Sequence, residues 1–312
     1  MTALLTPPLL ERTRALVLVA RRVVEGALHG LHRSPLHGLS IEFAEHREYS
    51  PGDELKHLDW KVIGRTQRYV VKQYDQETNL RAIVVVDASR SMAYGPRTVL
   101  GDGPPAPRSK FEYARVLAAA IGHVLLAQGD SVGLILASDR ITRQLAPRAA
   151  PGHIMGLCRA LVAAEPAGVT DLAAALGQLA VSLRRRSLVV LVSDLLDEPA
   201  RLISILGQLH HRGHETIVFQ VLDPVERRFA VGRVGGGITV LRDMETGRDF
   251  DAEPHLIQEL VQAEIGRFLA ELDAGAKRYG LHLVRTSTDE PPEHVLFEYL
   301  HRRLRGSKKR MM

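Results

Sequence analysis

Oxygen-bearing side chains follow two apolar runs of the sequence, at the points where strands are expected to end. Asp87, Ser89 and Ser91 come directly after the run 80–86, and Asp194 ends the run 187–193. In an extended chain, residues two apart point to the same side, so this spacing presents one carboxylate and two hydroxyls together. Such hard oxygen ligands suit Mg²⁺, or Mn²⁺ and Ca²⁺, better than zinc, which prefers nitrogen and sulfur.

A further hydroxyl comes from Thr170, in a Gly-Val-Thr-Asp loop that opens a predicted helix. Because ligands of open α/β sheets bind beyond the carboxyl ends of the strands, these side chains are expected to meet there. Each also has an ordinary alternative role. Asp87 could cap a turn, and Thr170 and Asp194 could each cap the helix that follows. Taken together, the positions predict a metal site made of Asp87, Ser89, Ser91, Thr170 and Asp194.

The elements that must position these residues alternate between strands and helices. Strands are predicted at 80–86, 131–138, 141–147, 187–193, 214–222 and 281–286, with helices at 110–128, 151–165, 171–184, 199–211, 255–279 and 292–304. This order indicates an α/β fold: a doubly wound, mostly parallel six-stranded sheet with helices on both faces. The uniformly apolar run 80–86 is expected at its centre. The two consecutive strands near 131–147 must form an antiparallel hairpin, which places 141–147 at an edge.

Segments outside this core differ in composition. A predicted helix over 9–28 leads into an extended arm, so residues 1–79 are expected to form an N-terminal part that packs on the core domain of residues 80–305. Residues 306–312 are basic and are expected to form a disordered tail. The Gly- and Pro-rich loop 93–108 follows Ser91 and is expected to overhang the site, where it either shapes partner choice or is disordered.

Composition excludes several classes of function. The 312 residues carry a formal charge of +5, concentrated after residue 301, without the interleaved aromatics of a nucleic-acid groove. No apolar run reaches the roughly 18 residues that span a bilayer, and the first residues do not resemble a signal peptide. The single cysteine, Cys158, excludes an intrachain disulfide and fits a reducing compartment. We therefore expect a cytoplasmic protein that does not bind nucleic acid and does not insert into a membrane.

Three motifs resemble the metal-ion-dependent adhesion site of von Willebrand factor A domains: DASRSM at 87–92, GVTDL at 168–172 and SDLLDEP at 193–199. The resemblance implies a sheet whose strand order is 3-2-1-4-5-6. It also implies that Ser89, Ser91 and Thr170 contact the metal through hydroxyls, and that Asp87 and Asp194 act directly or through water. A site of that kind keeps one position open for an acidic residue of a partner protein.

The block 37–77 resembles the signature of a bacterial family known as domain of unknown function number fifty-eight. The resemblance covers roughly residues 30–305. Members of that family commonly accompany MoxR-type AAA+ ATPases, which implies that such an ATPase, or its client protein, is the partner. The many polar groups of the block, among them His37, Glu42 and Asp53, permit an acid/base or histidine–metal site. We prefer a structural interpretation, an arm with ion pairs and a Pro-Gly turn.

The main alternative function is a Mg²⁺-dependent hydrolase or phosphoryl-transfer enzyme that uses Asp87. The haloacid-dehalogenase pattern requires a second aspartate two residues on, where this chain has Ser89. Neither a phosphate-binding G-x-x-x-x-G-K-[ST] loop nor a G-x-S-x-G elbow is present in the sequence. A metal without a positioned base binds an anion better than it activates water. We therefore expect a binding protein and not an enzyme.

Overall fold

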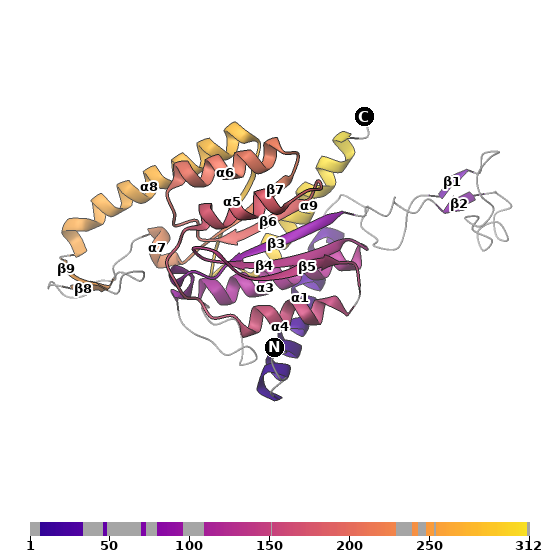
Figure 1. Ribbon diagram of the computed structural model, residues 1–312, viewed down its shortest axis with the longest axis horizontal. Coiled ribbons are helices and arrows are strands. Elements are labelled where there is room, and N and C mark those ends of the chain that lie inside the picture. Colours follow the sequence, from indigo (N-terminus) through magenta and orange to yellow (C-terminus); the bar gives the residue numbers. More distant parts are fainter. Residues whose placement is uncertain are drawn as a thin grey trace.

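A six-stranded sheet lies at the centre of the computed structural model (Figure 1). Its strands are β3 (Arg81–Asp87), β4 (Ser131–Ala137), β5 (Ile141–Arg148), β6 (Leu188–Ser193), β7 (Glu215–Leu222) and β10 (His282–Ser287). The structure describes residues 7–33, 46–48, 70–72, 80–95, 109–150, 152–228, 239–242, 248–252 and 254–310.

The strand order across the sheet is β10-β7-β6-β3-β4-β5. Numbered along the chain and read from β5, this is 3-2-1-4-5-6, as the resemblance to von Willebrand factor A domains implied. All neighbours pair in parallel except β4 and β5, which are antiparallel. The predicted fold class, the central position of residues 80–86 and the antiparallel edge strand are therefore confirmed.

Both faces of the sheet are covered, which explains why its inner strands are mostly apolar. Ala82, Val84 and Val86 of β3 belong to one buried cluster, and Ile83 and Val85 belong to a second cluster on the opposite face. Successive side chains of a strand point to opposite faces, so one uninterrupted apolar run supplies both cores.

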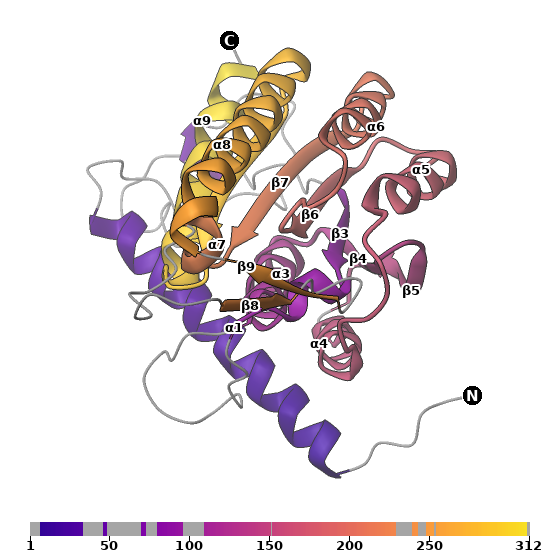
Figure 2. The same ribbon diagram turned by 90° about the vertical axis from the view of Figure 1, so that its left-hand side faces the viewer.

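Two groups of helices cover these faces (Figures 1 and 2). Buried residues of the first group pack on Val84 and its neighbours, and those of the second group pack on Ile83 and Val85. The first group is α1 (Pro7–Arg33), α3 (Lys110–Ala127), α4 (His153–Ala163) and α9 (Pro292–Arg310). The second group is α5 (Leu172–Ser182), α6 (Pro199–His211) and α8 (Pro254–Tyr279).

The N-terminal helix α1 is part of the core. It is longer than the predicted 9–28, and it packs against α3, α4 and α9. Its buried residues recur at the spacing of one helix face and are Leu16, Ala20, Val23, Val24 and Ala27. The last helix, α9, is also longer than expected, because it runs to Arg310 and takes in most of the tail expected to be disordered.

Short elements lie outside the main sheet. The strands β1 (His46–Glu48) and β2 (Val70–Lys72) form an antiparallel pair within the block 37–77. A second pair, β8 (Thr239–Arg242) and β9 (Asp249–Ala252), lies before α8. The remainder of the block 37–77 and residues 96–108 of the Gly- and Pro-rich loop fall outside the described residues. The roles expected for them stay predictions.

Two short helices were not predicted, and both lie near the carboxyl edge of the sheet. The 3-10 helix η2 (Arg90–Ala93) follows β3, and α7 (Pro224–Arg228) follows β7. In the described parts of the chain, no helix combines the length and the apolar character needed to cross a membrane.

The packing of α8 on α6 yields a prediction about stability. A Cβ atom added at Gly275 would lie 2.5 Å from the Cδ1 atom of Ile203. Gly275→Ala is therefore expected to lower the free energy of unfolding by about 1–3 kcal/mol, since Ile203 must move. Gly266→Ala, on the same helix, is the matched control: no atom lies within 4 Å of its added Cβ. This control is expected to stabilise by about 0.5–1 kcal/mol. Urea unfolding of both variants tests the packing, and equal effects would contradict it.

Candidate metal site

Three loops meet at the carboxyl edge of the sheet, and hydrogen bonds join them. The Ala167 amide donates to the Ala88 carbonyl at 2.8 Å, and the Arg90 amide donates to the Gly168 carbonyl at 3.2 Å. The loop after β3 is thereby attached to the loop before α5. The loop after β6 joins them because its Asp197 carboxylate accepts a 3.0 Å bond from the Ala173 amide.

Asp87, the last residue of β3, is fully buried, and each of its carboxylate oxygens accepts a hydrogen bond from the protein. One carboxylate oxygen accepts from the Ser89 amide at 2.8 Å, and the other accepts from the Ser193 hydroxyl at 2.6 Å. These two bonds fix the direction in which the chain leaves the strand and tie the end of β3 to the end of β6. Sequence reasoning passed over Ser193, whose hydroxyl faces this edge.

The hydroxyls of Ser89 and Ser91 lie 3.0 Å apart, and both residues are buried. The sequence argument for their proximity was wrong, since it assumed a fully extended chain. Ser89 is extended, but Ser91 lies within η2, and the 3-10 turn brings the two hydroxyls together. Ligands at neighbouring corners of an octahedron around Mg²⁺, at 2.0–2.1 Å from the ion, are about 2.9 Å apart. The serine pair therefore fits such an ion.

Thr170 lies in the loop that is bonded to Ala88 and Arg90, and it is half-buried. It is not the cap of the helix that follows. Asp171 is the N-cap of α5, and its carboxylate accepts a 3.1 Å bond from the Ala174 amide. The alternative role considered for Thr170 is therefore wrong.

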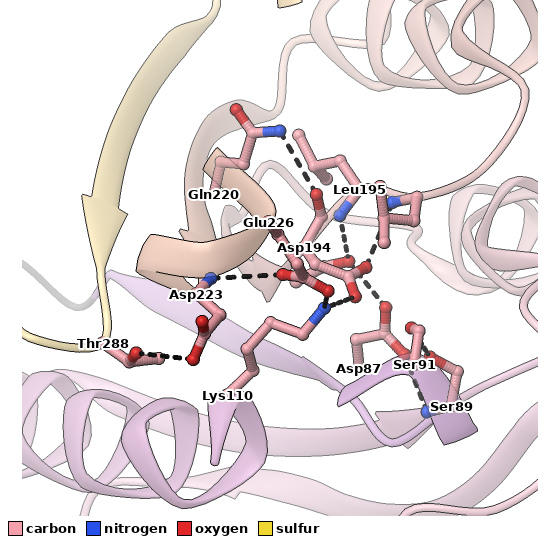
Figure 3. A network of polar contacts seen from close by, with 12 residues as sticks. Asp87, Ser89, Ser91, Lys110, Asp194, Leu195, Gln220, Asp223, Glu226 and Thr288 are labelled. Atoms are coloured by element: carbon pink, nitrogen blue, oxygen red, sulfur yellow. Dashed lines mark hydrogen bonds and ion pairs between the residues drawn. The ribbon is translucent and has the colours of Figure 1, made fainter. Parts of the chain in front are cut away.

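Asp194 follows β6 and is fully buried, and it does not cap α6, whose N-cap is Glu198. One of its oxygens accepts a 3.1 Å bond from the Leu196 amide. The chain turns sharply between them, because Leu195 has a φ of 61°, a conformation that costs about 1–3 kcal/mol in a residue other than glycine. The turn holds the carboxylate of Asp194 toward the end of β3, as Figure 3 shows.

The second oxygen of Asp194 accepts a hydrogen bond from Lys110, a residue that sequence analysis did not identify. The ammonium lies 2.7 Å from Asp194 and 2.6 Å from a carboxylate oxygen of Glu226 in α7 (Figure 3). The Lys110 side chain is 0% exposed, although it is the first residue of α3. An internal cation thus lies against one of the predicted metal ligands.

The position of Lys110, directly after the cap of a predicted helix, is the signal in the sequence that marks it as unusual. A lysine in the first turn of a helix opposes the positive end of the helix dipole, and a lysine is almost never fully buried unless it is paired. Ser109 caps α3 as expected, with its hydroxyl accepting from the Glu112 amide at 3.2 Å. The residue after this cap therefore required acidic partners from elsewhere in the chain.

Burial and charge shift the titration of these groups. Burial lowers the pKa of Lys110, but Asp194 and Glu226 together raise it above its ordinary value, so the ammonium stays charged. Burial raises the pKa of Glu226 against the opposing effect of Lys110. Burial, and then the charge of Asp194, raise the pKa of Asp87 to about 6, while hydrogen bonds from Ser193 and Ser89 partly oppose them.

The strand order, the antiparallel edge strand and this cluster of loops define a von Willebrand factor A-like domain. The chain belongs to the family described as "Protein of unknown function DUF58", whose model matches residues 45–260. An uncharacterized protein of Mycobacterium tuberculosis is 30% identical over 306 residues, which are 96% of this chain and 92% of that protein. An uncharacterized protein of Mycobacterium bovis matches with the same identity and coverage.

Two solved structures are similar in fold. BatB from Bacteroides thetaiotaomicron has a TM-score of 0.44 and 14% identity, covering 72% of this chain and 98% of that one. The SpRpn10 VWA domain has a TM-score of 0.39 and 12% identity, covering 70% of this chain and 93% of that one. These likenesses concern the fold alone.

The raised pKa of Asp87 predicts how the metal-free protein responds to pH. The pKa is about 6 in the folded protein and 3.8 ordinarily, so between these values the folded state binds more protons than the unfolded state. Stability therefore rises as the pH falls from about 6 to 4, and above pH 6 the buried charge costs up to about 3 kcal/mol. Asp87→Asn removes this cost while it keeps one acceptor oxygen.

Denaturant unfolding in EDTA tests this expectation. Asp87→Asn should be more stable than the unaltered protein at pH 7.5, and this advantage should disappear near pH 4. Asp139→Asn is the control, because its side chain is 42% exposed and its loss should change stability by less than about 0.5 kcal/mol. An Asp87→Asn advantage that did not depend on pH would show that the buried charge is not its cause.

Proposed function

We propose that this protein is a metal-dependent protein-binding module. Asp87, Ser89, Ser91, Thr170 and Asp194 hold Mg²⁺, for which Mn²⁺ or Ca²⁺ can substitute. The observation that carries the proposal is the pair of buried serine hydroxyls, 3.0 Å apart, at the edge of the sheet that also carries two fully buried aspartates. When bound, the ion supplies a positive centre for an anionic group of a partner.

The composition of the site favours an anionic partner. Hydroxyl ligands are neutral, so they leave more of the charge of the ion available to attract a carboxylate than acidic ligands would. We propose that an aspartate or glutamate of the partner protein completes the coordination of the ion. In the described part of the chain, no group of three or more His, Cys, Asp or Glu residues could hold a metal ion.

Apolar side chains near the site support binding of a protein in preference to a small anion. Val169 is 57% exposed beside Thr170, Leu196 is 40% exposed two residues after Asp194, and Val225 is 47% exposed beside Glu226. Each lies on a different one of the segments that carry the polar network. Exposed aliphatic groups around a polar centre are characteristic of protein interfaces, whose cores are depleted of charge.

An enzymatic role for Asp87 receives no support from its surroundings. A nucleophilic carboxylate needs an oxygen that can reach its target, but Asp87 is 0% exposed and both of its oxygens accept hydrogen bonds from the protein. These hydrogen bonds instead suit a residue that orients the Ser89 loop and acts on the proposed ion through water, one of the two modes that the resemblance implied. We therefore propose a binding role without catalysis.

The proposed partner is a MoxR-type AAA+ ATPase or its client protein, and the proposed location is the cytoplasm. The support for this partner is family membership, because members of the family are expected to accompany MoxR-type ATPases. Cys158, the single cysteine, is buried, and burial raises the pKa of its thiol to about 12. Its role is that of a small core residue, which fits a reducing compartment.

The metal site can be tested directly by calorimetry. Ser89→Ala removes one hydroxyl ligand, so Mg²⁺ affinity is expected to fall by at least about tenfold with the fold intact. Ser204→Ala is the control, since Ser204 lies exposed on α6 and its loss should leave the affinity unchanged. Equal Mg²⁺ affinity in the Ser89→Ala variant and the unaltered protein would remove the basis of the proposed site.

Partner binding requires a separate test. Capture of the cognate MoxR-type ATPase, or its client, is expected in Mg²⁺ and is expected to be lost in EDTA and in the Ser89→Ala variant. The Ser204→Ala variant should capture the partner as the unaltered protein does. If capture is equal under all these conditions and circular dichroism shows intact folds, the partner binds to another surface.

A further inference from the structure

Lys110 is a fully buried cation held by two carboxylates from distant parts of the chain. Its ammonium donates to Asp194 at 2.7 Å and to Glu226 at 2.6 Å, and the contact joins α3, the end of β6 and α7. The Lys110 and Asp194 side chains are 0% exposed, whereas the Glu226 side chain is 26% exposed. The ammonium is thus enclosed on the side of Asp194 and closer to solvent on the side of Glu226.

Because of its position, this ion pair bears on metal binding at Asp194 as well as on stability. Asp194 is one of the five proposed ligands, and Lys110 already occupies one of its two oxygens, while the Leu196 amide occupies the other. A metal ion that approaches Asp194 therefore meets a positive charge that is already in place. At separations of 4–5 Å, two such charges repel strongly even at an intermediate effective dielectric.

Glu226 shares the ammonium of Lys110 with Asp194. One of its carboxylate oxygens accepts from the ammonium, and the other is fixed by a 3.1 Å bond from the Asp223 amide at the start of α7. The more of the ammonium charge Glu226 neutralises, the less of it opposes a metal ion beside Asp194. The two residues should therefore have opposite effects on metal affinity.

We propose that Lys110 is a built-in competitor for the metal ion at Asp194, and that Glu226 moderates this competition by holding the ammonium from the side of α7. The inference rests on the proposed metal-dependent function. Lys110 lowers the affinity of the site for cations and makes its occupancy depend on the position of α7. Both are positioning residues, since neither is a proposed ligand of the ion.

The test is calorimetric titration of the full chain with Mg²⁺ and with Mn²⁺. Lys110→Met removes the competing charge and is expected to tighten metal binding by at least about tenfold, which is about 1.4 kcal/mol. Glu226→Gln removes the moderating charge and is expected to weaken metal binding severalfold. Lys110→Arg keeps the charge and should bind metal much as the unaltered protein does.

Thermal unfolding in EDTA provides a readout that separates this role from a purely structural one. Both Lys110→Met and Glu226→Gln break a buried ion pair, so both should lower the melting temperature. A purely structural role would therefore move stability and metal affinity downward together in both variants. Opposite changes in metal affinity, with stability lowered in both, would support competition.

A second variant keeps the test decisive if Lys110→Met does not fold. Lys110→Met with Glu226→Gln removes one charge of each sign, so Glu226 is no longer left as a carboxylate without its cation, and Asp194 is the one carboxylate of the three residues that loses its ammonium. Asp194 is no longer shared with an ammonium in this double variant, and metal binding should be at least as tight as in the unaltered protein. Weaker binding in a folded double variant would overturn the inference.

The remaining outcomes separate this inference from the proposed function. If the unaltered protein binds Mg²⁺ through Ser89 but Lys110→Met binds it no more tightly, the competition is refuted and the metal site stands. If only Lys110→Met binds Mg²⁺, the competition is supported, and metal dependence of the unaltered protein is refuted. If no variant binds Mg²⁺ or Mn²⁺, both are refuted.

Discussion

The parallel pairing of β3 with β6 is the constraint on which the site depends. Val86 lies opposite Val192, so the two strands end together and their next residues face the same edge. The bond between the Ser193 hydroxyl and Asp87 is a direct consequence of this register. A shift of one residue would turn Asp87 and its neighbours to the other face of the sheet and would bury polar groups in an apolar core. The apolar packing on both faces therefore fixes the geometry of the polar edge.

Buried charge is the second constraint, because carboxylates removed from water must be compensated. Asp87 is compensated by hydrogen bonds alone, from Ser89 and Ser193, and its raised pKa shows that this compensation is incomplete. Asp194 is compensated by a full positive charge from Lys110. The two aspartates of the site therefore differ: the carboxylate of Asp87 is compensated by hydrogen bonds, and that of Asp194 is compensated by an ammonium.

Much of this architecture follows from the sequence because it depends on local patterns. Apolar runs such as 80–86 predicted the inner strands, and the short gap between β4 and β5 required an antiparallel hairpin at the edge. The positions of Asp87 and Asp194 at the edge followed from the strands that precede them. What the sequence did not reveal depends on contacts between distant residues. Lys110 and Glu226 are 116 positions apart, and no periodic pattern connects them. The conformation after Ser89 was wrongly expected to be extended, since a 3-10 turn leaves little trace in composition.

The contrast between the aspartates bears on how stability and occupancy are related. A site that binds a cation tightly must hold negative charge close together, and in the absence of the cation that charge destabilises the fold. An internal ammonium relieves this repulsion at Asp194, so the metal-free protein keeps its structure at some cost in affinity for an ion. A ligand that binds only the folded state stabilises that state according to its concentration and affinity. Because Lys110 already compensates Asp194, a metal ion would add less to the stability of the fold under the proposed competition. Under the proposed function, this arrangement favours reversible occupancy of the site over permanent structural use of the metal.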